Sequence, residues 1–165
     1  MQIITLGDEL LRQKAVKIEN IDSEITEMAE LMLGVLKRDK GVGVAGPQLG
    51  FMKRIFVVHV EGDEERIFIN PSILETSHET SKYEEGCLSV PGVYANVVRS
   101  ETIKIQAWNE KGRPFTLEAN GLLARVILHE YDHLEGVLFF DHLPEKKREK
   151  LIEKYEKHEK NQGAK

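Results

Sequence analysis

The segment LLARVILHEYDHL, residues 122–134, constrains the fold of this chain more than any other stretch. In a helix built from it, apolar side chains occupy almost every side: Leu122, Leu123, Val126, Ile127, Leu128, Tyr131 and Leu134. A helix with this pattern is typical of a protein interior. Asn120-Gly121 before it and Gly136 after it are typical of helix ends. We therefore expect a buried central helix with the other elements packed around it.

The remaining periodicities predict helices near both ends of the chain and strands between them. Residues 21–39 place apolar side chains at helical spacing, with Asp22 or Ser23 able to cap the helix, and a highly charged helix is expected over about 145–160. A polar connector is expected over 75–83. Strands are predicted at 54–60, 66–69, 92–99, 102–108 and 114–119, the last two joined by the hairpin sequence NEKG. Strands grouped between helices predict an α+β fold, with antiparallel sheets around the central helix.

Composition and charge narrow the class of protein. With 165 residues, 41% of them apolar, the chain is long enough for one domain, which we expect to span residues 1–165. A net charge of −5 argues against a general nucleic-acid-binding protein, so no specific DNA partner is expected. Residues 145–165 carry eight Lys or Arg against five Glu, a balance of +3 that leaves −8 elsewhere. This basic C-terminal helix and tail is compatible with an interaction role.

The N-terminus, the apolar runs and the cysteine content give no indication of export or of a membrane span. The N-terminus lacks a basic stretch followed by a long apolar one, and no apolar run approaches the ~20 residues of a membrane span. We therefore expect a cytoplasmic protein with no membrane partner. The single cysteine, Cys87, excludes an intramolecular disulfide.

The segment GVGVAGPQ, residues 41–48, contains the glycine pattern G-x-G-x-x-G of dinucleotide-binding turns. That pattern binds a pyrophosphate only between a preceding strand and a following helix, whose N-terminal amides hold the phosphates. Here a predicted helix precedes the glycines and a predicted strand follows them. Nucleotide binding is therefore disfavoured, and the glycines must serve another backbone.

The motif HEYDH in the central helix indicates a metal site. Four residues turn a helix by ~400°, so His129 and His133 lie ~40° apart on one face and can bind one ion. Glu130 is offset by ~100° from His129 and flanks the ion, which suits a general base that acts on water. The alternative is two core histidines and a salt-bridged glutamate. Three ionisable groups in an apolar helix are costly to bury without a function, so the metal site is favoured.

The third ligand separates the possible reaction classes. In one group of metalloproteases it is the last histidine of H-E-x-x-H-x-x-G-x-x-H, but the matching position here is Phe139, which cannot bind a metal. The other common protease choice, a glutamate some twenty residues downstream of the second histidine, would be Glu153, which lies among Lys and Glu and is expected to be solvated. Upstream, YEEGCLSVPG places Cys87 in a glycine-flanked turn, and a thiolate is a good ligand for zinc or ferrous iron. An inert buried cysteine is the alternative.

Three segments, GVGVAGPQ, EGCLS and HEYDH, resemble in sequence and order the signature segments of peptide deformylases. These enzymes remove the formyl group from the N-terminal methionine of new bacterial proteins. The likeness runs from about Leu10 to Leu143 and includes INPSIL and GVLFFDHL. Three positions depart from the family pattern: Gly46 stands in place of the usual alanine, Leu128 in place of a glutamine, and Gly7-Asp8 in place of Asp-Pro.

The resemblance implies a role for each site residue. Cys87, His129 and His133 would hold one divalent ion, and Glu130 would move the proton. The Gln48 amide and the backbone N–H of Leu88 would bind the oxyanion, and Glu85 would pair with Arg99 to support the Cys87 turn. The remaining positions would bind the formyl-methionyl peptide: Val42, Gly43, Gly86, Tyr94, Leu122 and Val126.

The resemblance also implies the cofactor and the partners. The family is typically ferrous, with nickel or cobalt as working substitutes, and ligand softness also allows zinc. The substrates would be N-formyl-methionyl nascent peptides, and the C-terminal helix would contact the ribosome, unless it is merely solvated. Two other functions stay open on the residues alone: a general zinc endopeptidase, and a non-catalytic protein with a structural metal or a ribosome-binding role.

Overall fold

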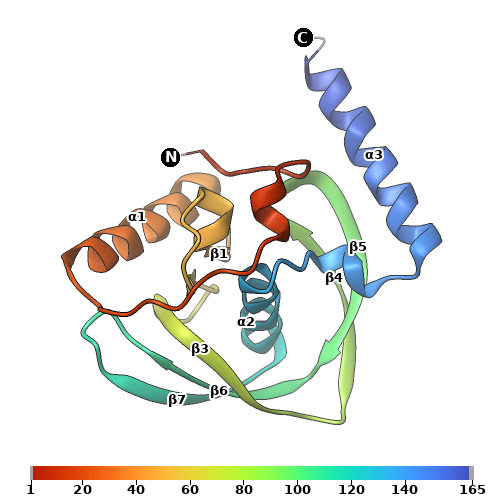
Figure 1. The fold of residues 1–165 in the computed structure, drawn as a ribbon. Coiled ribbons are helices and arrows are strands. Elements are labelled where there is room, and N and C mark those ends of the chain that lie inside the picture. Colours follow the sequence, from red (N-terminus) through yellow and green to blue (C-terminus); the bar gives the residue numbers. More distant parts are fainter. Residues whose placement is uncertain (1, 164–165) are drawn as a thin grey trace.

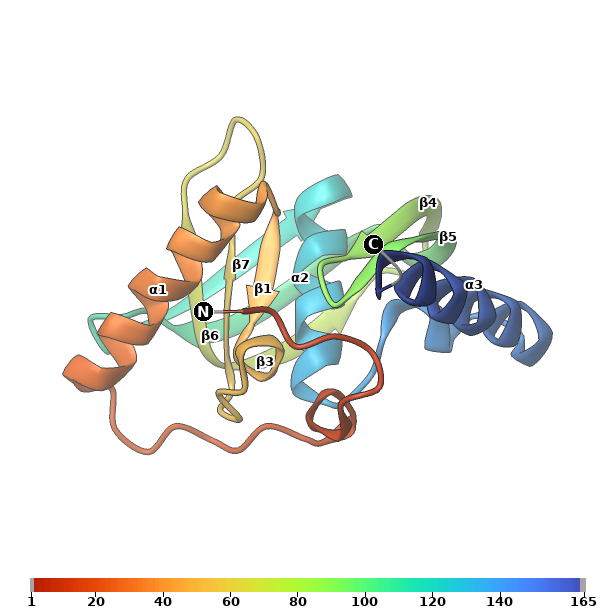
Figure 2. The same ribbon diagram turned by 90° about the horizontal axis from the view of Figure 1, so that it is seen from above.

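The computed structural model describes residues 2–163 and has helix α2 (Gly121–Leu134) at its centre (Figure 1). Around it lie a five-stranded antiparallel sheet of order β1-β2-β3-β6-β7 and the separate antiparallel pair β4–β5. The strands are β1 (Gly43–Ala45), β2 (Ile55–Val58), β3 (Arg66–Thr76), β4 (Thr80–Cys87), β5 (Val90–Ser100), β6 (Thr102–Trp108) and β7 (Pro114–Asn120). Helices α1 (Ser23–Asp39) and α3 (Glu145–Gly163) lie at opposite ends of the molecule (Figure 2). The predicted α+β fold, with antiparallel sheets around a central helix, is confirmed.

Strand β2 shows how the sheet is held between two helices. All four of its side chains are fully buried, and successive residues face opposite sides of the sheet. Ile55 and Val57 belong to the apolar cluster that includes α1, whereas Phe56 and Val58 belong to the cluster that includes α2. Both faces of this strand therefore lie in the core, which explains its uninterrupted apolar run.

The helix ends follow the local sequence signals. The Asp22 carboxylate accepts a hydrogen bond from the Ile25 N–H at 3.2 Å and so caps α1, as predicted. Helix α2 ends at Leu134, and Gly136 turns the chain with φ +74. A Cβ atom at Gly136 would lie 2.5 Å from the carbonyl oxygen of Arg12, so a side chain does not fit there.

The connector predicted over 75–83 is wrong. Strand β3 continues to Thr76 and β4 begins at Thr80, so residues 77–79 alone join them. The polar composition favoured a loop, because residues 75–83 lack the alternation of apolar and polar side chains that marks a half-buried strand. Pairing with β5 nevertheless makes the segment a strand, with Thr80 opposite Ser100 and Glu85 opposite Ala95. The short strand β1, which pairs with β2, was not predicted for the same reason: its conformation depends on a partner strand.

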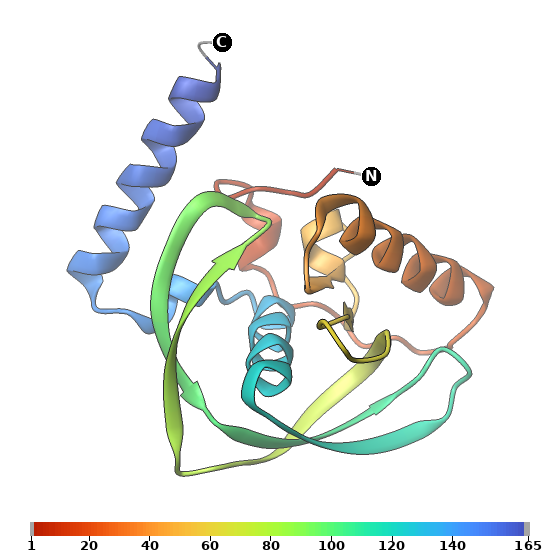
Figure 3. The same ribbon diagram turned by 180° about the vertical axis from the view of Figure 1, so that it is seen from behind.

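Helix α3 packs on the outer side of the β4–β5 pair and then extends away from the rest of the fold (Figure 3). The predicted charged helix over 145–160 is therefore confirmed and continues to Gly163. Its apolar stripe contacts a cluster formed largely by β5 and the residues that follow α2, and Tyr155 in that stripe is 5% exposed. No helix within residues 2–163 is long and apolar enough to cross a membrane.

Candidate metal centre and active site

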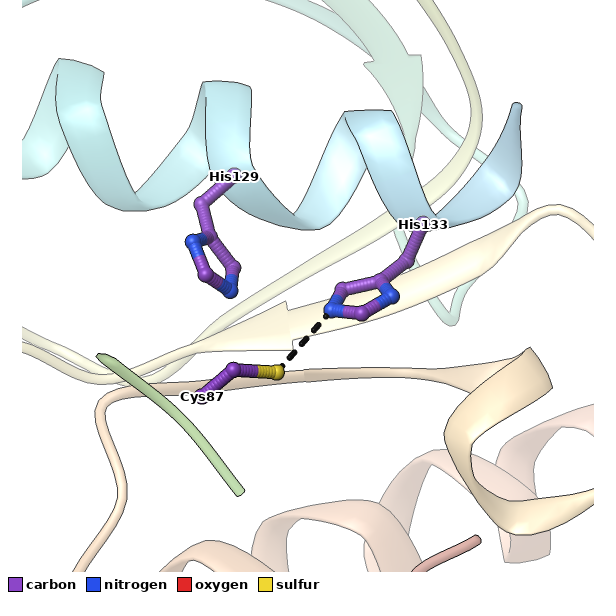
Figure 4. Close-up of side chains that lie close together, drawn as sticks. All are labelled: Cys87, His129 and His133. Atoms are coloured by element: carbon purple, nitrogen blue, oxygen red, sulfur yellow. Dashed lines mark hydrogen bonds between the residues drawn. The ribbon is translucent and has the colours of Figure 1, made fainter. Parts of the chain in front are cut away.

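Two elements bring Cys87, His129 and His133 together. The two histidines project from successive turns of α2, and Cys87 is the last residue of β4, beside a register shift after Gly86. One ligand atom from each residue lies within 4.8 Å of the others, and Cys87 Sγ is 3.3 Å from His133 Nε2 (Figure 4). A thiolate and two imidazoles are the donor set that zinc or ferrous iron accepts, so the residues fit a divalent metal ion.

Neither alternative third ligand joins this group. Phe139 is buried, and its ring stacks on His129 with the centroids 5.9 Å apart. Glu153 is exposed on α3. The arrangement therefore differs from both protease patterns considered above.

A buried carboxylate orients His129. His129 Nδ1 lies 2.8 Å from Glu85 Oε1, so the other ring nitrogen, Nε2, is the one that could bind a metal ion. Arg99 forms a two-point contact with Glu85 and also donates to Asp132 at 2.9 Å. Glu85 and Arg99 are each 7% exposed, so the pair lies in the interior. Burial alone would raise the pKa of Glu85, but the hydrogen bonds from His129 and Arg99 outweigh it and lower the pKa to about 2.

The two histidines differ in their electrostatic surroundings. Burial, followed by the positive charge of His129 and Arg99, lowers the pKa of His133 well below its usual value. Burial acts in the same direction on His129, but contacts with Cys87 and Glu85 outweigh it and raise the pKa. A ring held between a thiol and a carboxylate attracts positive charge, whether a proton or a metal ion.

Glu130 lies beside the three donors without joining them. It is 3% exposed, and within residues 2–163 its Oε1 has no hydrogen-bond partner. Burial raises its pKa to about 7, close to the value that suits proton exchange at neutral pH. A Cβ atom at Gly43 would lie 2.7 Å from Glu130 Oε2, so only glycine lets the segment 41–48 approach this carboxylate.

The side chain of Gln48 is held in one orientation. Its Oε1 accepts the Ala45 N–H at 2.9 Å, and its Nε2 donates to Ser89 Oγ at 3.0 Å and approaches Cys87 Sγ at 3.5 Å. Gln48 and Ser89 are almost completely buried. The amide NH₂ group therefore points toward the thiol, as an oxyanion donor near the metal would have to do.

The residues assigned to substrate binding by the resemblance line one cavity of about 470 Å³ that reaches Cys87 and His129. Glu130, Cys87 and His129 contribute to its wall together with Val42, Gly43, Gly86, Leu88, Tyr94, Leu122 and Val126. The expected buried central helix is confirmed over most of its length, but Leu122 in its first turn is 50% exposed. There the helix forms part of the cavity instead of the core.

Sequence reasoning missed Arg125, Asp132 and Ser89. Arg125 is buried and contacts Glu85, Asp132 accepts from Arg99 and His142, and Ser89 holds Gln48. Arg125 had a visible signal, because a charged residue in an otherwise apolar helix needs a partner. Asp132 and Ser89 have no comparable signal in the sequence, and only their tertiary contacts connect them to the site.

The structure explains one departure from the family pattern. A Cβ atom at Gly46 would lie 2.5 Å from the carbonyl oxygen of Phe51, so the alanine usual in the family would not fit without a backbone shift. Leu128 is partly buried and packs against the core cluster of α2. The Gly7-Asp8 departure lies at η1 (Glu9–Arg12), where the Asp8 carboxylate accepts the Leu10 N–H at 3.0 Å.

A Cys-His-His group beside a buried carboxylate and an apolar cavity is typical of metal-dependent hydrolases. The comparisons with known proteins narrow this class. The family model described as polypeptide deformylase matches residues 1–149. Peptide deformylase 1 of Clostridium perfringens is 51% identical over 136 residues, covering 82% of this chain and 92% of that protein. The peptide deformylase of Borreliella burgdorferi is 46% identical and covers 94% of both chains.

Solved structures agree with the sequence matches. A peptide deformylase from Legionella pneumophila superposes with a TM-score of 0.93 at 37% identity, covering 99% of this chain and 98% of that one. A peptide deformylase from Synechococcus elongatus, in complex with actinonin, has a TM-score of 0.89 at 38% identity, with 93% and 86% covered. The chain therefore belongs to the peptide deformylase family of metal-dependent hydrolases, which remove the formyl group from new polypeptides. The sequence-based identification is confirmed.

Proposed function

We propose that Cys87, His129 and His133 hold one divalent ion, Fe²⁺ in the native protein, and that the residues around it hydrolyse the N-formyl amide of formyl-methionyl peptides. The observation that carries this proposal is the meeting of one thiol sulfur and two imidazole nitrogens next to Glu130 at the end of the cavity. Sulfur and nitrogen donors favour iron or zinc over magnesium or calcium. When bound, the ion supplies a Lewis acid that activates water and polarises the formyl carbonyl.

Glu130 handles the proton in this scheme. The water oxygen bonds to the formyl carbon, and the Glu130 carboxylate accepts the proton that the water loses. As the C–N bond breaks, Glu130 delivers a proton to the leaving amine nitrogen, so the products are formate and a free N-terminus. Its burial and its pKa of about 7 support both roles.

Gln48 and the backbone N–H of Leu88 stabilise the negative charge on the formyl oxygen in this scheme. The contacts with Ala45 and Ser89 fix the Gln48 amide before substrate arrives. A donor that is already oriented needs no rearrangement in the transition state, and the loss of one such donor typically costs ~3 kcal/mol of barrier.

The apolar part of the cavity suits the methionine side chain. Val42, Leu122 and Val126 supply apolar wall, and Tyr94 stands beside Gly86, where a Cβ atom would lie 2.6 Å from the tyrosine ring. We propose that Tyr94 and the backbone at Gly43 and Gly86 flank the peptide chain. Nascent formylated peptides arise at ribosomes, so we propose that the enzyme acts in the cytoplasm.

Contact between the basic C-terminal helix and the ribosome is part of this proposal. The inner stripe of α3 is packed against β5, so deletion of the helix would disturb the fold as well. Charge reversal at the exposed Lys150, Lys154 and Lys157 is the cleaner test. Co-sedimentation with ribosomes at low salt should fall, and an unchanged amount in the pellet would mean that the helix is only solvated.

A comparison of two peptides tests the proposed function. Formyl-Met-Ala-Ser should release formate rapidly, and acetyl-Met-Ala-Ser should be hydrolysed barely, because the site is expected to admit a carbonyl carbon that bears only hydrogen. Chelation should abolish the activity, and actinonin, the ligand in the Synechococcus elongatus complex, should inhibit it. Equal rates on the two peptides would overturn the assignment, and metal analysis of protein purified without oxygen identifies the native ion.

A further inference from the structure

Arg125 is a buried cation that the proposed reaction does not use. It lies in the second turn of α2 and is 6% exposed. Its Nη1 donates to Glu85 Oε2 at 2.6 Å and to the Val97 carbonyl at 2.8 Å. Its Nη2 donates to the carbonyl oxygen and the Oγ of Ser81, at 2.8 and 3.1 Å. The guanidinium thus joins α2 to both strands of the β4–β5 pair.

The carboxylate of Glu85 has a partner in every acceptor direction. Oε1 accepts from Arg99 Nη2 at 3.0 Å and lies 2.8 Å from His129 Nδ1. Oε2 accepts from Arg99 Nε and from Arg125 Nη1, both at 2.6 Å. A carboxylate offers about four acceptor sites, so all are filled. Without Arg125, Oε2 would keep one donor, and the carboxylate could pivot about Arg99.

We propose that Arg125 is a positioning residue that clamps Glu85 against His129 Nδ1, and thereby sets how firmly Cys87, His129 and His133 retain their metal ion. The inference rests on the proposed ligand roles. The orientation of a ligating imidazole depends on the partner of its second nitrogen, and loss of such a partner typically weakens metal binding by about 10- to 100-fold. Arg125 acts one contact further out, so an effect near the lower end is expected.

A simple charge effect would have the opposite sign. Arg125 is a cation near a cation site, so its removal alone should strengthen metal binding by reducing repulsion. A positioning role predicts weaker binding, because the carboxylate that orients His129 is no longer held from both sides. The direction of the change therefore separates the two explanations.

The experiment compares Arg125→Met and Arg125→Lys with the unaltered full chain, each loaded with Co²⁺. The rate of Co²⁺ transfer to an excess of chelator is measured, together with the visible absorption of the bound ion, which reports its ligand geometry. Methionine removes the charge and the donors, whereas lysine keeps the charge but not the planar fork. Co²⁺ release should be about tenfold faster for Arg125→Met, and the increase should be smaller but clear for Arg125→Lys. The absorption spectrum of the bound ion should change in both variants.

Arg54→Met is the matched control. Arg54 donates to the Leu134 carbonyl and to Glu135 at the C-terminal end of α2, and does not contact Glu85. The Arg54→Met substitution should lower the melting temperature without altering the rate of Co²⁺ release. Release from Arg125→Met at the rate of the unaltered chain or slower would overturn the inference, and Arg125→Lys decides it if the methionine variant does not fold. An unaltered chain that binds no Co²⁺ would instead overturn the proposed ligand set, and this inference with it.

Discussion

Helices α2 and α3 carry charged and polar residues in opposite surroundings. In α2, Arg125, His129, Glu130 and His133 are all buried among apolar neighbours. In α3, Lys and Glu alternate on an exposed surface, and the contact with the rest of the fold is a narrow stripe around Tyr155. The two helices are similar in secondary structure, but their side chains serve different purposes.

The difference follows from the cost of burial. A buried polar group without a partner costs several kcal/mol, and each of these four side chains in α2 has a contact or a proposed chemical role. The exposed charges of α3 remain solvated, and single exposed ion pairs contribute ~0–1 kcal/mol. Substitutions in α2 should therefore change the chemistry, whereas those in α3 should leave the chemistry unchanged.

His133→Ala should have the largest effect. It removes one of the three proposed protein ligands, so the protein should lose its metal and fall to undetectable formate release. Stability should decrease too, because metal binding contributes to folding. Metal content per chain, formate release and thermal unfolding are the measurements. A variant that retains both metal and activity would remove His133 from the ligand set.

Glu130→Gln should separate binding from chemistry. The glutamine amide has the size of the carboxylate, so the metal should stay bound. The amide cannot accept a proton, so turnover should fall by about 10²- to 10⁴-fold. Metal content is measured beside formate release. A metal-loaded variant with full activity would exclude Glu130 as the base, whereas a metal-free one would identify it as a ligand.

Tyr155→Ala should lower stability without altering the reaction. Its ring is buried between α3 and β5, and truncation of a buried aromatic side chain typically costs ~3 kcal/mol. Denaturant unfolding measures the loss, and Tyr155→Phe, which keeps the ring, should cost far less. If the Tyr155→Ala variant is fully folded in the assay and its kcat still falls by more than about tenfold, α3 also shapes the active site. The contrast between α2 and α3 would then not hold.

Glu153→Gln should have the smallest effect. This exposed glutamate on α3 is the third ligand that the protease pattern with a downstream glutamate would require, yet it lies apart from the Cys-His-His group. Metal content and formate release should be unchanged, and stability should shift by less than ~0.5 kcal/mol. Loss of metal in this variant would revive the endopeptidase alternative.

Local patterns in the sequence determined much of this protein. The periodicity of residues 21–39 with Asp22, the apolar run of β2 and the i, i+4 spacing of HEYDH each depend on neighbours a few residues away. Such signals are readable because helix and strand geometry repeats over short distances. The three signature segments indicated the family and, through it, the expectation for Gln48. Cys87 was already a candidate ligand, because it is the single cysteine and lies in a glycine-flanked turn.

Tertiary structure decided the rest. Strand β4 is polar and becomes a strand only by pairing with β5, and Gly46 is required only because the Phe51 carbonyl lies against it. Arg125 meets Glu85 across 40 residues of sequence, and Gln48 meets Ser89 across 41. No local rule encodes such contacts, because the energy of a buried ion pair or hydrogen bond depends on which distant group the fold places opposite it.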